Sequence, residues 1–219
     1  MAYNVTIGAT NPGTADAHFS TWAAFLQSGR PGITPTDWTV TFLDGQEHLA
    51  TSGQVSLIQG SWYEDANSLT VTSEGFTGIP YGQPGGSTSR LSFPFSATFK
   101  IFYGASLGAL VKTLKFTDME IKLGSGSGSA QALVKTENTG TNCHLIFDRC
   151  VFTDFTAASA NNNNAFRVGS NSGKGLRIVN SRFYNFNLNS GSFSSVVRFD
   201  NYVNNTGGVE IFGCEFVNL

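Results

Sequence analysis

The sequence predicts an all-β solenoid, a coil of short parallel strands in which each turn buries its apolar side against the turns next to it. Three observations support this fold class: an internal repeat, apolar spacings that fit strands turning corners, and loops rich in Gly, Asn and Ser. Repeats with a period of roughly 20 to 50 residues are typical of solenoids, propellers and arrays. No repeat contains the apolar period of a helix, which excludes leucine-rich repeats.

The repeat is clearest in LRIVNSRFYNF, which begins at Leu176. Counted from that residue, apolar side chains lie at offsets 0, 2, 7 and 10, and a small residue lies at offset 5. The same pattern begins at Leu145, Val209 and, more weakly, Leu114 and Leu69, with spacings of 31, 31 and 33 residues from Leu114 onward. Apolar residues two apart share one face of a strand, whereas a step of three indicates a corner with the same side inward. Each repeat is therefore predicted to be a bent coil.

The copy that starts at Leu69 is irregular. It places Phe76 and Ile79 at the inward offsets 7 and 10, but it has Glu74 at offset 5. It is followed by a Gly/Pro-rich excursion, residues 78–95, which lengthens the distance to the next copy to 45 residues. We expect this excursion to be a long loop outside the coil.

Corner positions carry residue types that tolerate a left-handed backbone. Asn180 and Gly213 occupy offset 4, while Asp154, Asn185 and Asn218 occupy offset 9. Gly, Asn and Asp adopt positive φ more easily than other residues, so these positions are predicted to be turns.

Offset 5 is predicted to be a small inward slot of the stacked coils. It holds Met119, Cys150, Ser181 and Cys214, so both cysteines are interpreted as structural thiols two coils apart, too distant for a disulfide. Cys143 lies in a loop without a partner that would make it a nucleophile. We expect no metal site and no cofactor.

The N-terminal unit, residues 1–37, is predicted to hold a strand and a short helix. The stretch HFSTWAAFLQSGR has Ser20 or Thr21 as N-cap, and its apolar face carries Trp22, Phe25 and Leu26. We expect this helix to cover the open end of the first coil.

The rest of the chain, residues 38–219, is predicted to be one continuous solenoid with coils beginning near residues 69, 114, 145, 176 and 209. Further strand candidates, ALVKT, AFRVG and VVRFD, lie between the repeats, so each coil should contribute to more than one sheet.

These coils, with their aromatic ladders, Asn-rich corners and variable loops, resemble the right-handed parallel β-helix superfamily. Its members include pectate-lyase-like polysaccharide enzymes and the spikes, fibres and other surface proteins of bacteriophages. The resemblance implies a bacteriophage virion structural protein, either a capsid decoration or a tail spike or fibre component. It also implies a homotrimer whose partners are neighbouring virion proteins or host surface polysaccharide.

Composition limits the other function classes. Charged residues make up only 13% of the chain and the formal net charge is −2, which gives no reason to expect nucleic acid as a partner. No apolar run reaches the roughly 18 residues of a membrane span, and the start MAYNVTIGATNPG has no secretory signal. We therefore expect synthesis in the host cytoplasm, no membrane insertion, and incorporation into the virion.

The carboxylates bear on whether the chain is a polysaccharide-degrading enzyme, because polysaccharide hydrolysis needs two of them. Equal offsets on neighbouring coils lie side by side, so Arg177 should pair with Glu210 and Arg182 with Glu215. Such pairing lowers a carboxyl pKa and makes a poor general acid. No catalytic residue is therefore assigned, but Glu120 and Asp148 are the candidates if the chain is an enzyme.

Two alternative functions remain open. The first is a polysaccharide depolymerase, a glycoside hydrolase or lyase, acting through Glu120 or Asp148. The second is a non-catalytic adhesin in which exposed aromatic side chains stack on sugar rings. Trp62, Tyr63 and Tyr81 lie in predicted loops and are the candidates for either glycan binding or a subunit interface.

Overall fold

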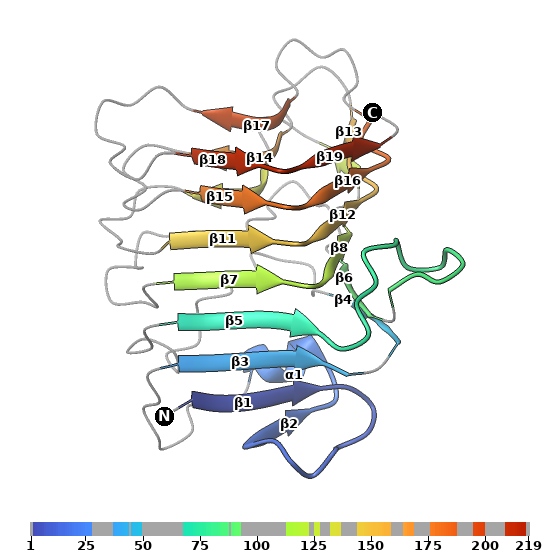
Figure 1. The fold of residues 1–219 in the computed structure, drawn as a ribbon, viewed down its shortest axis with the longest axis vertical. Coiled ribbons are helices and arrows are strands. Elements are labelled where there is room, and N and C mark those ends of the chain that lie inside the picture. The colour runs from blue at the N-terminus through green and yellow to red at the C-terminus, as the bar shows by residue number, and fades with distance from the viewer. Residues whose placement is uncertain are drawn as a thin grey trace.

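The computed structural model describes residues 2–27, 37–43, 45–49, 68–87, 89–92, 113–122, 125–127, 132–136, 144–158, 164–168, 176–187, 195–199 and 209–217. Strands dominate these residues and stack one above another from the N-terminal to the C-terminal end of the molecule (Figure 1). All pairings between the described strands are parallel, so the predicted all-β parallel solenoid is confirmed.

Sheet A is the longest sheet and runs the whole length of the described solenoid, in the order β18-β15-β11-β7-β5-β3-β1-β2. Its strands are β1 (Ala2–Ile7), β2 (Ala17–Phe19), β3 (Asp37–Phe42), β5 (Ser68–Ser73), β7 (Thr113–Thr117), β11 (His144–Asp148), β15 (Leu176–Val179) and β18 (Val209–Phe212).

Sheet B follows the first corner of each coil, in the order β19-β16-β12-β8-β6-β4. Its strands are β4 (Glu47–Leu49), β6 (Arg90–Ser92), β8 (Glu120–Lys122), β12 (Val151–Thr153), β16 (Arg182–Tyr184) and β19 (Glu215–Val217).

The strand candidates between the repeats form sheet C, made of β10 (Ala132–Thr136), β14 (Asn164–Val168) and β17 (Ser195–Phe199). A two-stranded pair, β9 (Ser125–Ser127) with β13 (Thr156–Ala158), lies between sheets B and C in the chain. Three successive coils, which begin at β7, β11 and β15, therefore each contribute a strand to sheets A, B and C.

The register of sheet A reproduces the repeat. Leu114, Leu145, Leu176 and Val209 pair in succession along β7, β11, β15 and β18. The same column continues toward the N-terminus through Leu69, so the spacing read from the sequence is the spacing of the coils. The leucines of this column are at most 2% exposed, which places the column in the core.

Aromatic rings fill the centre of the later coils. In sheet B, Phe152 stacks on Phe183 with ring centroids 4.9 Å apart, and Phe183 stacks on Phe216 at 4.7 Å. Phe147 and Phe166 meet Phe152 edge to face, at 5.3 and 5.2 Å, from sheets A and C. Offset stacking and edge contacts are the preferred geometries of aromatic pairs, so the three sheets share one packed core.

The corner between sheets A and B is a single left-handed residue in successive coils. Asn180 has φ 51° and Gly213 has φ 64°, as predicted for offset 4. Asp118 and Arg149 occupy the same corner with φ 51° each. At the second corner Asp154 and Asn185 have φ 59° and 56°, again as predicted, while Asn218 lies outside the described residues.

The irregular copy at Leu69 was predicted wrongly at its second half. Phe76 is only half-buried and Ile79 is 37% exposed, so neither enters the core. The inward position in sheet B belongs instead to Leu91 of β6, which pairs with Ile121 and is fully buried. The chain therefore leaves the coil after β5 and returns at β6, so the excursion predicted for residues 78–95 was wrong at residues 90–92, which belong to the coil because Leu91 points inward.

The N-terminal helix exists but the predicted capping role is not supported. Helix α1 (Trp22–Gln27) begins after Thr21, whose hydroxyl oxygen accepts a hydrogen bond from the amide of Ala24 at 3.1 Å. Trp22 and Phe25 are fully buried, as expected. However, the last strand of sheet A is β2, and α1 lies behind β1 and β3, where Trp22 packs on Phe42 with ring centroids 5.6 Å apart (Figure 1).

Strand β1 of the predicted N-terminal unit pairs with β3, which spans the predicted boundary between residues 37 and 38, so sheet A continues across that boundary. The division of the chain into an N-terminal unit and a solenoid stays a prediction. Among the described residues, no helix is long and apolar enough to cross a membrane.

Candidate functional site

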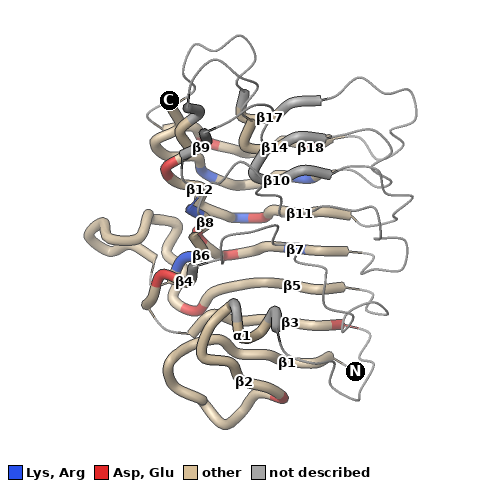
Figure 2. Tube along the Cα trace, turned by 180° about the vertical axis from the view of Figure 1, so that it is seen from behind, with Lys and Arg blue, Asp and Glu red and all other residues tan. Residues whose placement is uncertain are grey.

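Among the residues that the structure describes, the most distinctive surface feature is the excursion between β5 and β6, which we call the strap (residues 74–89, described except for residue 88). It projects from the flank of the solenoid beside sheet B, whereas the strands that carry it remain in the coil (Figures 1 and 2). Compact loops with their own hydrogen bonds, held on a rigid scaffold, are frequent sites of function.

Internal hydrogen bonds close the strap on itself. The amide of Ser87 donates to the carbonyl oxygen of Ile79 at 2.8 Å, and the amide of Gln83 donates to the carbonyl oxygen of Pro80 at 3.1 Å. Gly86 sits at the crossing, where a Cβ atom would lie only 2.2 Å from the carbonyl oxygen of Pro80. The close approach of these two backbone segments therefore requires glycine at this position.

The strap reaches across several rungs of sheet B. The amide of Tyr81 donates to Oε2 of Glu120 on β8 at 2.5 Å. Further along the sheet, the guanidinium of Arg182 on β16 donates to the carbonyl oxygen of Gly78 at 3.3 Å. On the other side, the Tyr81 hydroxyl donates to the carbonyl oxygen of Gly45 at 3.3 Å, just before β4.

Glu120 lies beneath the strap and is 0% exposed. Its Oε1 accepts a hydrogen bond from the Thr153 hydroxyl at 3.1 Å, and its nearest cation is Nη1 of Arg90 at 4.0 Å. Burial raises the pKa of Glu120 above its ordinary value, because the bonds from Tyr81 and Thr153 and the charge of Arg90 only partly offset the loss of solvation.

Arg90 is shared between two carboxylates and an aromatic ring. Its Nη2 atom lies 2.7 Å from Oε2 of Glu47, much closer than its contact with Glu120. Its guanidinium also lies over the Tyr81 ring, 4.5 Å from the centroid, a cation–π geometry. Partial burial raises the pKa of Glu47, but bonds from Arg90 and Ser92 outweigh it and leave the pKa below its ordinary value. Arg90 is thus mainly the partner of Glu47.

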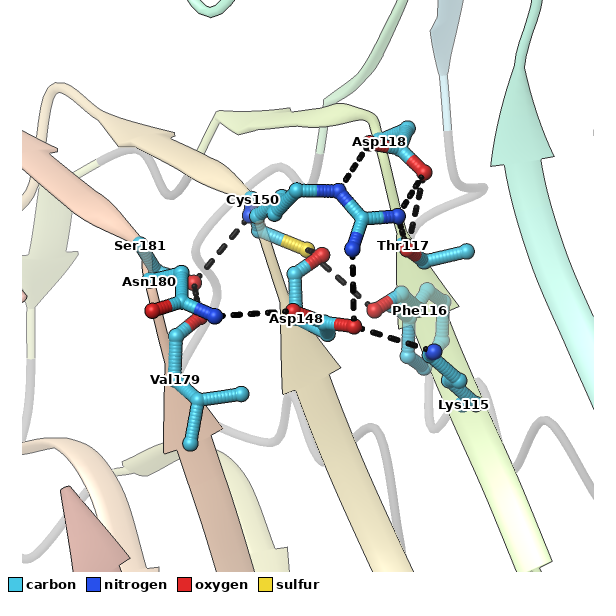
Figure 3. A network of polar contacts seen from close by, with 10 residues as sticks. Lys115, Phe116, Thr117, Asp118, Asp148, Cys150, Val179, Asn180 and Ser181 are labelled. Atoms are coloured by element: carbon cyan, nitrogen blue, oxygen red, sulfur yellow. Dashed lines mark hydrogen bonds and ion pairs between the residues drawn. The ribbon is translucent and has the colours of Figure 1, made fainter. Parts of the chain in front are cut away.

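A second polar cluster lies at the corner between sheets A and B (Figure 3). The Arg149 guanidinium donates to both carboxylate oxygens of Asp118, at 2.7 and 2.6 Å, which holds the pKa of that carboxyl below its usual range. It also donates to Asp148 at 3.2 Å. Lys115 contacts the same Asp148 oxygen at 3.0 Å, and the side chain of Asn180 donates to the other at 3.5 Å.

The geometry does not unite the two carboxylates considered for catalysis. Glu120 belongs to sheet B under the strap, and Asp148 ends a strand of sheet A; within the described residues no hydrogen bond or ion pair joins them. Asp148 is engaged by two cations, whereas Glu120 is shut away from solvent.

The cross-rung pairs are confirmed. Arg177 and Glu210 are register partners and meet at 3.1 Å, and Arg182 and Glu215 do so at 2.9 Å. All four side chains are roughly half exposed, so these pairs contribute little to stability.

The offset-5 ladder also lies where the sequence placed it: Met119, Cys150 and Ser181 are buried, and Cys214 is partly buried. Burial raises the pKa of the Cys150 thiol, and its sulfur contacts the carbonyl oxygen of Phe116 at 3.4 Å, consistent with a structural thiol.

Of the aromatic candidates, only Tyr81 can be placed. It is half-buried against Arg90, and Trp62 and Tyr63 lie outside the described residues, as does Cys143. Arg90 and its pairing with Glu47 were not predicted from the sequence, because their strands do not belong to a recognisable repeat copy. In the described part of the chain, no group of three or more His, Cys, Asp or Glu side chains could hold a metal ion.

Comparison with protein-family models, with curated proteins and with solved structures finds no match to this chain.

Proposed function

We propose that the chain is a bacteriophage virion structural protein, a capsid decoration or a tail spike or fibre component, in which the solenoid is a rigid rod that displays its loops. The observation that carries the proposal is the matched register of sheet A, which keeps one apolar column inward through successive coils. The proposal takes the coil as right-handed, the sense that parallel crossovers adopt in about 98% of cases.

The state of the carboxylates favours a structural role over catalysis. The Asp148 carboxylate is held by Lys115 at 3.0 Å and by Arg149 at 3.2 Å, so both of its cationic neighbours already engage it. Glu210 and Glu215 are each paired with an arginine of the neighbouring rung. Both pairs join register partners of neighbouring strands, as expected for surface charges that support the alignment of the coils rather than catalysis.

The proposal is tested by the solution mass of the purified chain, measured by size-exclusion chromatography with light scattering before and after mild SDS treatment. We expect a homotrimer, with three times the 23.4 kDa mass of one chain, that survives the treatment. A boiled sample is the control and should run as a single chain. A monomer at every concentration before SDS treatment would contradict the trimer and weaken the virion assignment.

One observation keeps the polysaccharide depolymerase as a second candidate. Glu120 is a buried carboxyl with a raised pKa, which is the property that a general acid requires. The test is release of reducing ends or unsaturated sugars from a panel of bacterial capsular polysaccharides. An enzyme acting through Glu120 would lose this activity in Glu120→Gln but retain it in Arg177→Gln, a change in an exposed ion pair on sheet A.

The adhesin remains a prediction that depends on Trp62. It would be retained on immobilised host polysaccharide, and Trp62→Ala would abolish the retention without altering the solution mass.

A further inference from the structure

Glu120 presents an unusual balance of interactions for a carboxylate in a protein core. It is 0% exposed, and its two oxygens meet one backbone amide, one hydroxyl and a cation at 4.0 Å. A buried charge is stable only when it is closely paired and hydrogen-bonded, and the closest cation is mainly engaged by Glu47. The site is therefore better suited to a neutral carboxyl group than to a carboxylate.

The charged groups on the surrounding elements do not change this conclusion. On β6, Arg90 bonds to Glu47 of β4, and on β8, Lys122 also lies toward Glu47, at 4.0 Å. On β16, Arg182 bonds to Glu215 and to the strap carbonyl. After β12, Asp154 adds a negative charge that raises the pKa of Glu120 further.

The neighbour of Glu120 on the next rung is apolar. Val151 pairs with Glu120 in register and is 1% exposed. Of the two register neighbours of Glu120, Arg90 is a cation and Val151 is apolar, so a cation lies on only one side. The strap covers the carboxyl group through the Tyr81 amide. Any movement of the strap away from sheet B would give the carboxyl group access to water.

We propose that the strap is a pH-sensitive clamp, closed on sheet B when Glu120 is protonated and released as Glu120 loses its proton to solvent. The direction of the pH dependence follows from the linkage between proton binding by Glu120 and closure of the strap. A carboxyl whose pKa is raised in the closed form stabilises that form fully below its open-form pKa. This stabilisation is lost as the pH rises through the closed-form pKa. Acidic conditions therefore hold the strap closed, and rising pH opens it.

The test is hydrogen exchange of the Tyr81 amide, which bonds to Glu120, followed by NMR from about pH 4 to about pH 8, a range that starts near the ordinary Glu pKa of about 4.3. Exchange chemistry itself accelerates with pH, so each rate is divided by the rate in Glu120→Gln at the same pH. This variant keeps the shape of the side chain and stays neutral.

We expect the ratio of wild-type to variant rates to rise with pH, by up to tenfold for each unit that separates the closed-form and open-form pKa values. The amide of Val151, which bonds to the Met119 carbonyl oxygen in the coil, is the internal control and should show a constant ratio. A flat or falling ratio at Tyr81 overturns the proposal, and so does an equal rise at Val151, because the opening would then not be confined to the strap.

A second variant keeps the test decisive if Glu120→Gln does not fold. Asp154 has φ 59°, a conformation that asparagine adopts at the equivalent Asn185, so Asp154→Asn should preserve the corner. It removes the negative charge that raises the pKa of Glu120, and we expect opening of the strap to begin at a lower pH. An unchanged or higher midpoint would contradict the assignment of Glu120 as the titrating group.

Discussion

The aromatic column of sheet B allows a quantitative test of the core. Phe152, Phe183 and Phe216 are successive members of it, but Phe152 is 0% exposed and Phe216 is 44% exposed. Truncating a fully buried Phe to Ala costs about 3 to 5 kcal/mol, since both the transfer free energy and the cavity contribute. Phe152 also contacts three other rings, at 4.9 to 5.3 Å, which places its cost in the upper part of that range.

Phe216 provides the matched control because, among the residues that the structure describes, its ring stacks on one other ring, that of Phe183. Since almost half of the side chain is already in water, Phe216→Ala should cost about half as much, roughly 1.5 to 2.5 kcal/mol. The free energy of unfolding is measured by urea denaturation followed by far-UV circular dichroism. Equal costs for Phe152→Ala and Phe216→Ala would refute the inward column, and a cost below about 1 kcal/mol for Phe152→Ala would refute the packing around it.

Three further predictions concern the corner and the strap. Arg149→Asn should change the free energy of unfolding by less than about 1 kcal/mol, because the variant loses an exposed ion pair but relieves the strain of the left-handed backbone. Arg149→Val loses the same ion pair without relieving that strain, so it should cost more in the same denaturation assay. Arg149 lowers the pKa of Asp118, so Asp118 contributes stability that is present above its unfolded-state pKa and is lost as the pH falls through its folded-state pKa. The free energy of unfolding should therefore fall less steeply with acid in Arg149→Asn than in the wild type, and an unchanged slope would contradict this. Gly86→Ala should open the strap, seen as faster amide exchange at Tyr81, with Gln83→Ala as an exposed control that leaves it unchanged.

The fold was predictable because a solenoid repeats its physical requirements at each rung. The same inward column that pairs Leu114, Leu145 and Leu176 in the structure is visible as a constant spacing in the sequence. The left-handed corners at Asn180 and Gly213 were predictable because few residue types adopt positive φ. Arg149 at the same corner was not, because its ion pair with Asp118 compensates a backbone conformation that composition would not suggest.

The strap was the part that sequence periodicity could not resolve. Phe76 and Ile79 fit the inward offsets by spacing alone, but spacing does not reveal where a long insertion begins. Leu91 takes the inward place because the chain re-enters sheet B only at β6. The burial of Glu120 was not predictable for the same reason: its position on the outer face suggests a surface residue, whereas the strap places the Tyr81 amide on its carboxyl group and the side chain is 0% exposed.

The order of charges along the outer column of sheet B connects the strap to the rod. The column reads Glu47, Arg90, Glu120, Val151, Arg182 and Glu215, with neighbours paired in parallel register. Acidic and basic side chains alternate along it except at Val151, and Glu120 is the acidic member that we propose to be neutral when the strap is closed. The alternation is therefore interrupted where the strap bonds to Glu120 on one side and to Arg182 on the other. The strap is therefore anchored where the alternation of acidic and basic side chains is interrupted. We expect it to move without changing the register of the coils, because the Glu47–Arg90 and Arg182–Glu215 ion pairs at the two ends of the column remain in place.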